Sequence, residues 1–304
     1  MERLSVSFGY AARDTLCAEF DLAKTSILAE FHDLADKDVI ASINAAAQRQ
    51  DVTVEVHVEA RPSRYSHAPG AAQHDARALA ALRGKLDDRV SLIAEDDPGV
   101  LMHCKAAVVD NDTALIGTAN PTKSGFESDG EILVTSHSPG DVAAVAASVA
   151  GQAVSGDYVV AGPDASLRLR LRHLLNTDGD LRIATEDLSD REVVSALLAR
   201  SAAGHHDRLL VEDKDASSAQ RIAERQLLSS GVDVRGLASG YMHEKYVDAG
   251  DEIYVGSANL TRNGIDEARE IGVVAPTAAF GPGASAMRTG FDAMWTSARA
   301  VACG

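Results

Sequence analysis

The chain has 304 residues, a formal net charge of −16 and an aromatic content of only 4%. A surface this acidic repels polyanions, which weighs against a nonspecific nuclease, and few aromatic side chains weigh against docking on a bilayer. The sequence has neither an apolar stretch of about 18 residues, as a membrane span needs, nor the apolar run of a signal peptide. Its three widely spaced cysteines argue against a disulfide framework. We therefore expect a cytoplasmic protein.

The first predicted elements are a strand and a helix between residues 27 and 43. The same pattern returns between residues 181 and 197, and the two segments align without gaps. In the second segment, Ser189-x-x-Glu192 predicts a capping box at the start of the helix. The repeat therefore predicts two halves with the same order of elements.

A polar segment is longer in the first half than in the second. The stretch from Glu59 to His103 spans 44 residues, whereas the matching stretch from Glu212 to His243 spans 31. We expect the 13 additional residues to fall within residues 61–74. Basic and aromatic side chains stand out there in an acidic chain, and they are Arg61, Arg64, Tyr65 and His67. Two interpretations stay open, a loop at the cleft rim that selects the substrate's headgroup or leaving group, and a solvated surface insertion.

The most informative segments are two copies of one motif, 140 residues apart. Each begins with Met-His-x-Lys, at His103 and Lys105 and again at His243 and Lys245. The apolar run after each lysine predicts a strand, and a hairpin leads to a second short strand and a Gly-(Ser/Thr)-Ala-Asn sequence. Side chains alternate along a strand, so each imidazole and ammonium should share a face while Cys104 points away. The hydroxyl and amide side chains that follow are Thr118, Asn120, Ser257 and Asn259.

Two such sets of side chains suit displacement at phosphorus. An imidazole acts as a nucleophile or as a general acid and base near neutral pH. Lysine and asparagine neutralise and hydrogen-bond oxygens that gain charge in a transition state. Two imidazoles on opposite sides of one phosphorus allow one to attack while the other protonates the leaving oxygen. These side chains do not form a preferred ligand set for a divalent metal ion. We therefore expect neither a metal nor a cofactor.

These residues resemble the signature of the phospholipase D superfamily, which is His-x-Lys, Asp and Gly-Ser-x-Asn, present twice in each active site. The resemblance implies that His103 is the nucleophile that forms a phosphohistidine and that His243 is the general acid and then the base. The groups implied to hold or support the non-bridging oxygens are Lys105, Lys245, Asn120, Asn259, Thr118 and Ser257. The motif aspartate, mainly structural in this family, is Asp110 in the first copy, and Asp248 and Asp251 are both candidates in the second.

An acidic residue lies at a similar distance after each motif histidine. Glu131 follows His103 by 28 residues, and Glu270 follows His243 by 27 residues. The resemblance implies that such a carboxylate orients a histidine, fixes its tautomer and stabilises the imidazolium. We expect each copy of the motif to carry its own orienting carboxylate. His32 has no partner motif, and we interpret it as a structural or surface histidine.

The alternation of strands and helices, together with the resemblance, predicts an α/β protein built from two pseudo-twofold-related α/β/α sandwich halves, each with a mixed sheet flanked by helices. The expected halves are residues 1–155 and 156–304, with the cleft at their seam. Each half should end in a helix, near residues 142–152 and 284–300. The run at residues 167–172 alternates like a strand, but its place in the repeat favours a helix, so both remain open.

The function expected from these patterns is a metal-independent phosphodiester hydrolase or a phosphatidyl- or phosphoryl-group transferase that acts through a phosphohistidine. Its substrate should be a small molecule or a lipid headgroup rather than a long nucleic acid, and the protein should act as a monomer without stable membrane insertion. Two alternatives remain: a nuclease of the same superfamily that acts on DNA or RNA, and a catalytically silent binding or scaffold paralogue. The residues do not fix whether water or an alcohol accepts the group.

Overall fold

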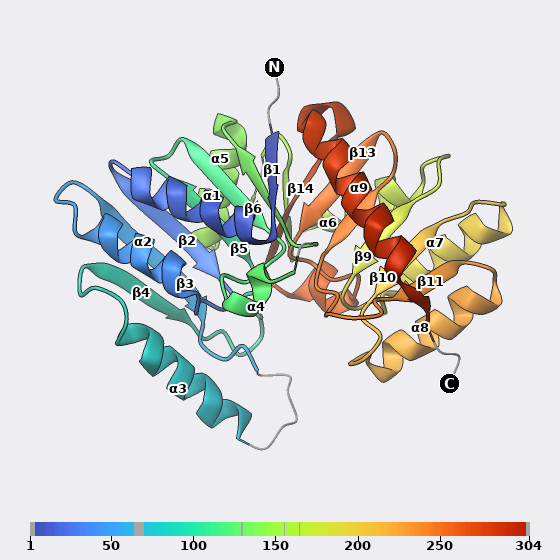
Figure 1. The fold of residues 1–304 in the computed structure, drawn as a ribbon, viewed down its shortest axis with the longest axis horizontal. Helices are drawn as coiled ribbons and strands as arrows, with labels where there is room; N and C mark the ends of the chain where they lie inside the picture. Colours follow the sequence, from blue (N-terminus) through green and yellow to red (C-terminus); the bar gives the residue numbers. More distant parts are fainter. Residues whose placement is uncertain (1–3, 64–69, 129, 155, 164, 302–304) are drawn as a thin grey trace.

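The computed structural model describes residues 4–63, 70–128, 130–154, 156–163 and 165–301. Its first half is built on a seven-stranded sheet in the order β1-β7-β6-β5-β2-β3-β4 (Figure 1). The pairs β2–β3 and β3–β4 are parallel and all others are antiparallel, so the sheet is mixed. The strands are β1 (Leu4–Phe8), β2 (Ser26–Phe31), β3 (Thr53–Glu59), β4 (Val90–Glu95), β5 (Lys105–Val109), β6 (Thr113–Gly117) and β7 (Ile132–Ser136).

The second half repeats this sheet strand for strand. Its order is β15-β11-β10-β9-β12-β13-β14-β8, so that β8 corresponds to β1, β14 to β7 and β9 to β2, with β15 added at the far edge. The strands are β8 (Val159–Gly162), β9 (Arg182–Thr185), β10 (Arg208–Val211), β11 (Asp233–Gly236), β12 (Tyr246–Asp248), β13 (Glu252–Gly256), β14 (Glu270–Pro276) and β15 (Arg299–Ala300). The predicted α/β fold with two related halves is confirmed.

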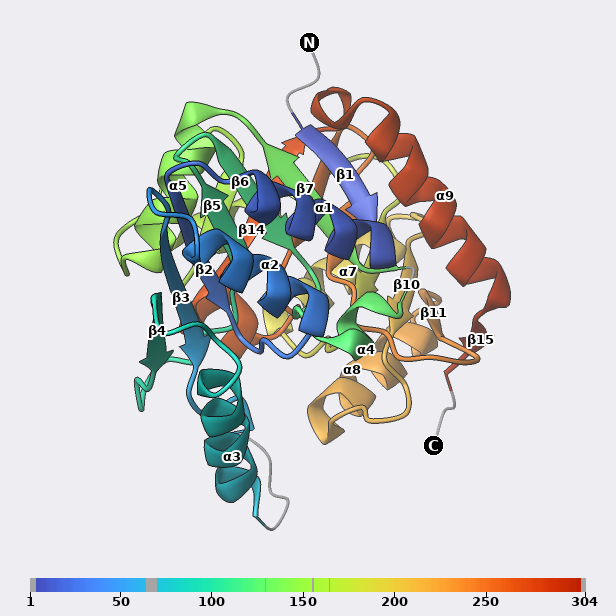
Figure 2. The same ribbon diagram turned by 60° about the vertical axis from the view of Figure 1, so that its left-hand side comes forward.

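Helices cover the outer faces of both sheets and also lie between them. In Figures 1 and 2, α1 and α2 cover the first sheet, and α9 runs beside β1. The helices are α1 (Gly9–Leu22), α2 (Lys37–Ala47), α3 (Ala71–Arg83), α4 (Lys123–Phe126), α5 (Pro139–Val149), α6 (Ala165–Leu175), α7 (Arg191–Ala202), α8 (Ser218–Ser229) and α9 (Pro282–Ser297), with a π-helical turn η1 (Asn263–Glu267) and a 3₁₀ turn η2 (Thr277–Phe280). In the described part of the chain, no helix combines the length and the apolarity that crossing a bilayer requires.

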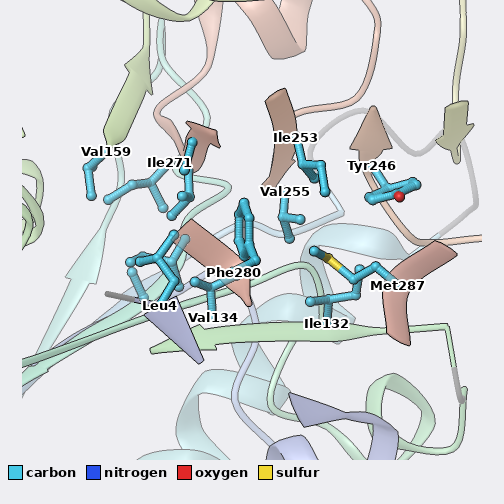
Figure 3. Packing of buried hydrophobic residues seen from close by; sticks show 14 of the residues in the cluster. Leu4, Ile132, Val134, Val159, Tyr246, Ile253, Val255, Ile271, Phe280 and Met287 are labelled. Carbon is cyan, nitrogen blue, oxygen red and sulfur yellow. The ribbon is translucent and has the colours of Figure 1, made fainter. Parts of the chain in front are cut away.

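A central core joins the two halves. Leu4 and Val134 of the first sheet meet Val255 and Ile271 of the second sheet in one buried cluster, to which α9 adds Met287 (Figure 3). Separate clusters fill the outer layers, under α1 and α2 in the first half and under α6, α7 and α8 in the second. Because the central core takes side chains from both sheets, burial of apolar surface fixes the two halves against each other.

The ambiguous run in the second half is helical. Residues 167–172 lie within α6, where Leu167, Leu171 and Leu174 are buried at helical spacing while Leu169 is 60% exposed. The alternation of leucine and arginine therefore does not indicate a strand here. The position of the segment in the repeat predicted the helix correctly.

The capping box predicted at Ser189 is wrong, although the helix begins where expected. The N-cap of α7 is Asp190, whose Oδ1 accepts hydrogen bonds from the backbone N–H groups of Glu192 and Val193. Asp36 caps α2 in the same way. A carboxylate next to the helix start also interacts favourably with the helix dipole, so the aspartate holds this position in both halves.

Candidate active site

Both motifs lie at the start of a central strand and are anchored by buried carboxylates. The strands begin at Lys105 and at Tyr246, so each histidine lies in the extended segment just before its strand. The backbone N–H of Met102 donates to Oε2 of Glu59 at 3.0 Å, and that of Met242 donates to Oε2 of Glu212 at 2.7 Å. Equivalent carboxylates, one at the last residue of β3 and one directly after β10, thus fix the two motif segments.

The orienting carboxylates cross between the halves. Nδ1 of His103 lies 2.9 Å from Oε1 of Glu270, and Nδ1 of His243 lies 2.9 Å from Oε1 of Glu131. The expectation that each motif carries its own carboxylate is therefore wrong. The packing of the halves places β14 opposite the first histidine and β7 opposite the second. In each pair Nε2 is the ring nitrogen that this carboxyl does not contact, although Nε2 of His243 lies 3.7 Å from Oε2 of Glu186.

The hydroxyls of the motifs connect these carboxylates back to their own halves. Oγ1 of Thr118 donates a short hydrogen bond to Glu131, and Oγ of Ser257 donates one to Glu270. Each carboxylate is consequently held by a hydroxyl of its own half while it binds the histidine of the other. Two hydrogen-bond chains result, Thr118–Glu131–His243 and Ser257–Glu270–His103, and each runs from one half to the other.

The two motif lysines are almost fully buried. Nζ of Lys105 donates to the carbonyl oxygen of His103 at 2.7 Å, and Nζ of Lys245 donates to that of His243 at 2.6 Å. Burial lowers the pKa of Lys105 to about 7. The charge of Glu270 raises this pKa and so offsets part of the effect of burial. Lys245 has an additional carboxylate partner, Glu186, at 2.9 Å.

The two histidines have unlike electrostatic surroundings. The pKa of His103 lies well below 6.5. The main cause is burial, and the positive charges of Lys105 and Lys245 lower the pKa further. Burial raises the pKa of its partner Glu270 to about 8. Burial also opposes ionisation of Glu131, but the neighbouring charges of His243 and Lys245 outweigh it and lower the pKa of that carboxyl. The pKa of the carboxyl that orients His103 is therefore raised, and the pKa of the carboxyl that orients His243 is lowered.

Two residues of the site were missed from the sequence, and they occupy equivalent positions. His32 follows β2, and its ring lies edge-on to His103 with the ring centroids 4.8 Å apart. Its Nδ1 lies 3.0 Å from the carbonyl oxygen of Met102, so His32 belongs to the site and is no surface histidine. Glu186 follows β9. The gap-free alignment of residues 27–43 with 181–197 places His32 and Glu186 at the same position of the repeat. This equivalence was the sequence signal that could have identified them.

The motif asparagines take different partners. Nδ2 of Asn259 donates to Oε2 of Glu186 at 3.0 Å. Asn120 lines a groove of about 800 Å³ together with His243 and Glu131. Oδ1 of both asparagines is buried without a hydrogen-bond partner, a costly state that a bound donor would relieve.

The groove beside His243 has no lysine or arginine in its described lining. Besides His243, its charged or titratable residues are Glu127, Glu131 and Tyr241. The remaining polar lining is dominated by hydroxyl groups and glycines, namely Thr122, Ser124, Ser128, Ser239, Ser297, Gly125, Gly130 and Gly240. Such a surface offers hydrogen bonds but no cations for a run of phosphates.

Asp110 lies at the other end of β5 from the motif lysine and has a structural environment. Its Oδ1 accepts hydrogen bonds from the backbone N–H groups of Thr25 and Ser26, and Oδ2 accepts one from Lys24. In the second half, Asp248 is the residue with comparable contacts, since it accepts from the N–H of Gly250 and forms ion pairs with two arginines, Arg182 and Arg288.

The proposed specificity loop is only partly described. Nε of Arg61 lies 2.5 Å from Oδ1 of Asp96, so this arginine is engaged away from the motif residues. Arg64, Tyr65 and His67 lie outside the described residues. Over the described chain, no group of three or more His, Cys, Asp or Glu side chains is arranged to hold a metal ion.

Two related α/β halves, each carrying one His-x-Lys motif, define the class of this protein, and its family follows from comparison with known proteins. The family model described as "Cardiolipin synthase, PLD-like domain" matches residues 16–151 and 171–295. The chain therefore belongs to this phospholipase D-like family. No curated protein matches the sequence significantly.

Solved structures share the fold at low sequence identity. The phosphatidylserine synthase of Haemophilus influenzae Rd KW20 matches with a TM-score of 0.71 and 12% identity, over 98% of this chain and 87% of that one. The polyphosphate kinase of Porphyromonas gingivalis matches with a TM-score of 0.60 and 16% identity, over 89% of this chain and 47% of that one, so this chain spans about half of its length. The phospholipase D family member Nuc of Salmonella typhimurium matches 47% of this chain at 19% identity, with a TM-score of 0.43 over 95% of its own length.

Proposed function

We propose that the protein is a phosphodiester hydrolase or group transferase that acts without a metal through a phosphohistidine on His103. The observation that carries the proposal is the crossed pairing of His103 with Glu270 and of His243 with Glu131. It couples each imidazole to the other half and directs each Nδ1 to a carboxyl. Nε2 of His103 is then left for the attack, and Nε2 of His243, 3.7 Å from Glu186, is left for proton transfer.

In the first step, Nε2 of His103 attacks phosphorus and the bond from phosphorus to the leaving oxygen breaks. His243 donates its proton to that oxygen. Lys105 and Lys245 supply positive charge to the non-bridging oxygens, and the amide N–H groups of Asn120 and Asn259 supply hydrogen bonds, as their charge increases.

In the second step, His243 accepts the proton of a water or alcohol molecule. The oxygen of that molecule attacks phosphorus, the bond from phosphorus to Nε2 of His103 breaks, and the free imidazole returns. With water the outcome is hydrolysis, and with an alcohol it is transfer to a new headgroup.

The electrostatic difference between the half-sites supports this division of roles. A nucleophilic imidazole must be unprotonated, and burial with two nearby lysines lowers the pKa of His103. We assign the acid role to His243, which lies between two carboxylates, Glu131 at 2.9 Å from Nδ1 and Glu186 at 3.7 Å from Nε2.

The substrate we propose is a small phosphodiester or a headgroup-sized part of a lipid. The net charge of −16 and the groove without lysine or arginine in its described lining disfavour a long nucleic acid. The names of the matching family model and of the phosphatidylserine synthase concern lipid synthases, which favours headgroup chemistry for this chain as well.

A substrate panel tests the proposal. Phospholipids, nucleotide diesters and single-stranded DNA and RNA are incubated with the wild type, His103→Ala and His243→Ala in the presence of EDTA, and His137→Ala serves as the control histidine. We expect turnover of a lipid or small diester by the wild type and the control, and loss of turnover in both motif variants. Activity that disappears with EDTA would contradict the metal-free mechanism, and cleavage of nucleic acid alone would assign the protein to the nucleases.

A further inference from the structure

Glu186 occupies the position where a bound anion is expected. Its Oε2 lies 2.9 Å from Nζ of Lys245, 3.0 Å from Nδ2 of Asn259 and 3.7 Å from Nε2 of His243. Its Oε1 accepts a hydrogen bond from the hydroxyl of Tyr241 at 2.8 Å. One carboxylate oxygen thus contacts an ammonium, an amide and an imidazole of the same half-site.

Among the described residues, no carboxylate takes the equivalent place in the first half-site. The residue that corresponds to Glu186 there is His32, which turns its Nδ1 to a backbone carbonyl 3.0 Å away and packs against His103. Nζ of Lys105 donates to the carbonyl oxygen of its own motif histidine. The two halves are otherwise built from the same strands, so this difference is specific to one position.

We propose that Glu186 is an internal competitor for the substrate, which holds the place of a non-bridging phosphoryl oxygen on Lys245 and Asn259 until a phosphodiester displaces it. The inference rests on the proposed function, because that function assigns these two groups to the phosphoryl oxygens. Both the side chain of Glu186 and a phosphoryl oxygen are anionic acceptors, and one ammonium with one amide N–H cannot serve both at full strength.

The competitor also sets which anions the site accepts. Glu186 directly follows β9 and its side chain is 23% exposed, so a substrate displaces the carboxylate by rotation of the side chain, which leaves the charge near the phosphorus. Glu186 is ionised, because the charges of Lys245 and His243 outweigh burial and hold its pKa well below 4.5. A retained negative charge repels a dianion more than a monoanion, so Glu186 selects monoanionic diesters over dianionic oxyanions.

Binding of tungstate, a dianion, and of dimethyl phosphate, a monoanionic diester, tests this role without turnover. Isothermal titration calorimetry at pH 8 compares the wild type with Glu186→Gln, which keeps the shape and removes the charge. The control is Glu252→Gln, which removes a carboxylate outside the groove, at the opposite end of β13 from Ser257 and 3.0 Å from Arg170. We expect about tenfold tighter tungstate binding in Glu186→Gln, a smaller gain for dimethyl phosphate, and no change in the control. Unchanged or weaker tungstate binding in Glu186→Gln overturns the proposal.

A second variant separates loss of charge from loss of structure. Tyr241→Phe removes the hydrogen bond to Oε1 but leaves the carboxylate, so displacement becomes easier and tungstate binding should tighten about two- to threefold. Weaker tungstate binding in this variant contradicts the proposal. If turnover is lost in His103→Ala and His243→Ala while tungstate binding is insensitive to Glu186→Gln, the role of Glu186 fails and the proposed function stands.

Discussion

The carboxylate of Glu270 lies 2.9 Å from Nδ1 of His103, although the two residues belong to different sheets of the protein. Glu131 and His243 repeat this relationship in the opposite direction. Neither half can therefore orient its own histidine. The central core that joins the sheets is a requirement of the site as well as of stability.

The crossed pairing predicts which step each carboxylate affects. An aryl phosphodiester has a leaving group that departs without a proton, so its release reports formation of the phosphohistidine alone. Glu270→Gln should slow this release about 100-fold because it disturbs His103, whereas Glu131→Gln should leave the release fast and slow the later turnover. Stopped-flow release of the aryl alcohol measures both phases.

The same experiment has a clear contrary result. If the carboxylates acted within their own halves, Glu131→Gln would slow the rapid phase and Glu270→Gln would spare it. Glu252→Gln, which changes a carboxylate outside the groove at the start of β13, should preserve both phases.

Anion binding should be accompanied by uptake of a proton on Lys105. Burial lowers the pKa of this ammonium to about 7, so it is mostly neutral at pH 8. A bound dianion favours the charged form and raises that pKa, so a proton is taken up. Titration of tungstate in two buffers with different ionisation enthalpies gives the number of protons, which we expect to be between about 0.5 and 1 at pH 8.

Lys105→Met provides the control for this proton uptake. The variant should bind tungstate more weakly and take up fewer protons than the wild type. Equal proton numbers in the two proteins would place the titrating group elsewhere.

The central core should tolerate truncation poorly. Phe291 of α9 is 1% exposed, and its ring centroid lies 5.9 Å from that of Trp295 and 6.2 Å from that of Tyr246. Phe291→Ala should lower the free energy of unfolding by about 3–5 kcal/mol, measured by urea denaturation. Leu169→Ala, at an exposed position of α6, should change it by less than about 0.5 kcal/mol, and equal losses would contradict the assignment of the core.

Asp110 should contribute to stability and not to turnover. Asp110→Asn keeps a residue that tolerates the left-handed backbone at φ 54°, but it weakens the hydrogen bonds from the N–H groups of Lys24, Thr25 and Ser26. We expect a loss of about 2 kcal/mol in the free energy of unfolding at pH 7, with kcat unchanged.

The pH dependence of this loss follows from the pKa of Asp110. Burial opposes ionisation of Asp110. The hydrogen bonds that its carboxylate accepts from backbone N–H groups outweigh this effect and lower its pKa in the folded state below 3.8. Its stabilisation is therefore complete above the unfolded pKa and is lost as the pH falls through the folded pKa. The wild type and Asp110→Asn should approach each other in stability at acid pH, and a difference that grows there would contradict this origin.

Local patterns were sufficient for most of the elements. The repeated segment near residues 27–43 and 181–197 and the duplicated hairpins predicted two related halves, because strand alternation and helical spacing are properties of neighbouring residues. The capping residue was misplaced by one position because Ser189 satisfied the spacing of a capping box while Asp190, the next residue, offered the stronger acceptor for the helix N–H groups.

The site could be predicted only in part, since its decisive contacts join the halves. Spacing placed Glu131 and Glu270 at the start of matching strands, but it carried no information on which histidine lies opposite each strand in the packed protein. Glu186 was not singled out, and His32 was interpreted as a structural or surface residue, for a different reason. They share one column of the repeat but differ chemically, and their contacts with Lys245 and His103 arise from the folded arrangement.

Direct detection of the covalent intermediate tests the central claim most directly. His243→Ala is mixed with an aryl phosphodiester, which needs no acid to release its leaving group, and the protein is denatured in base and analysed by mass spectrometry. Without the base of the second step, one phosphoryl group per chain should accumulate on His103, be stable in base and be lost in acid. Absence of the adduct together with continued turnover, or an adduct on His243 in His103→Ala instead, would contradict the assignment of His103 as the nucleophile.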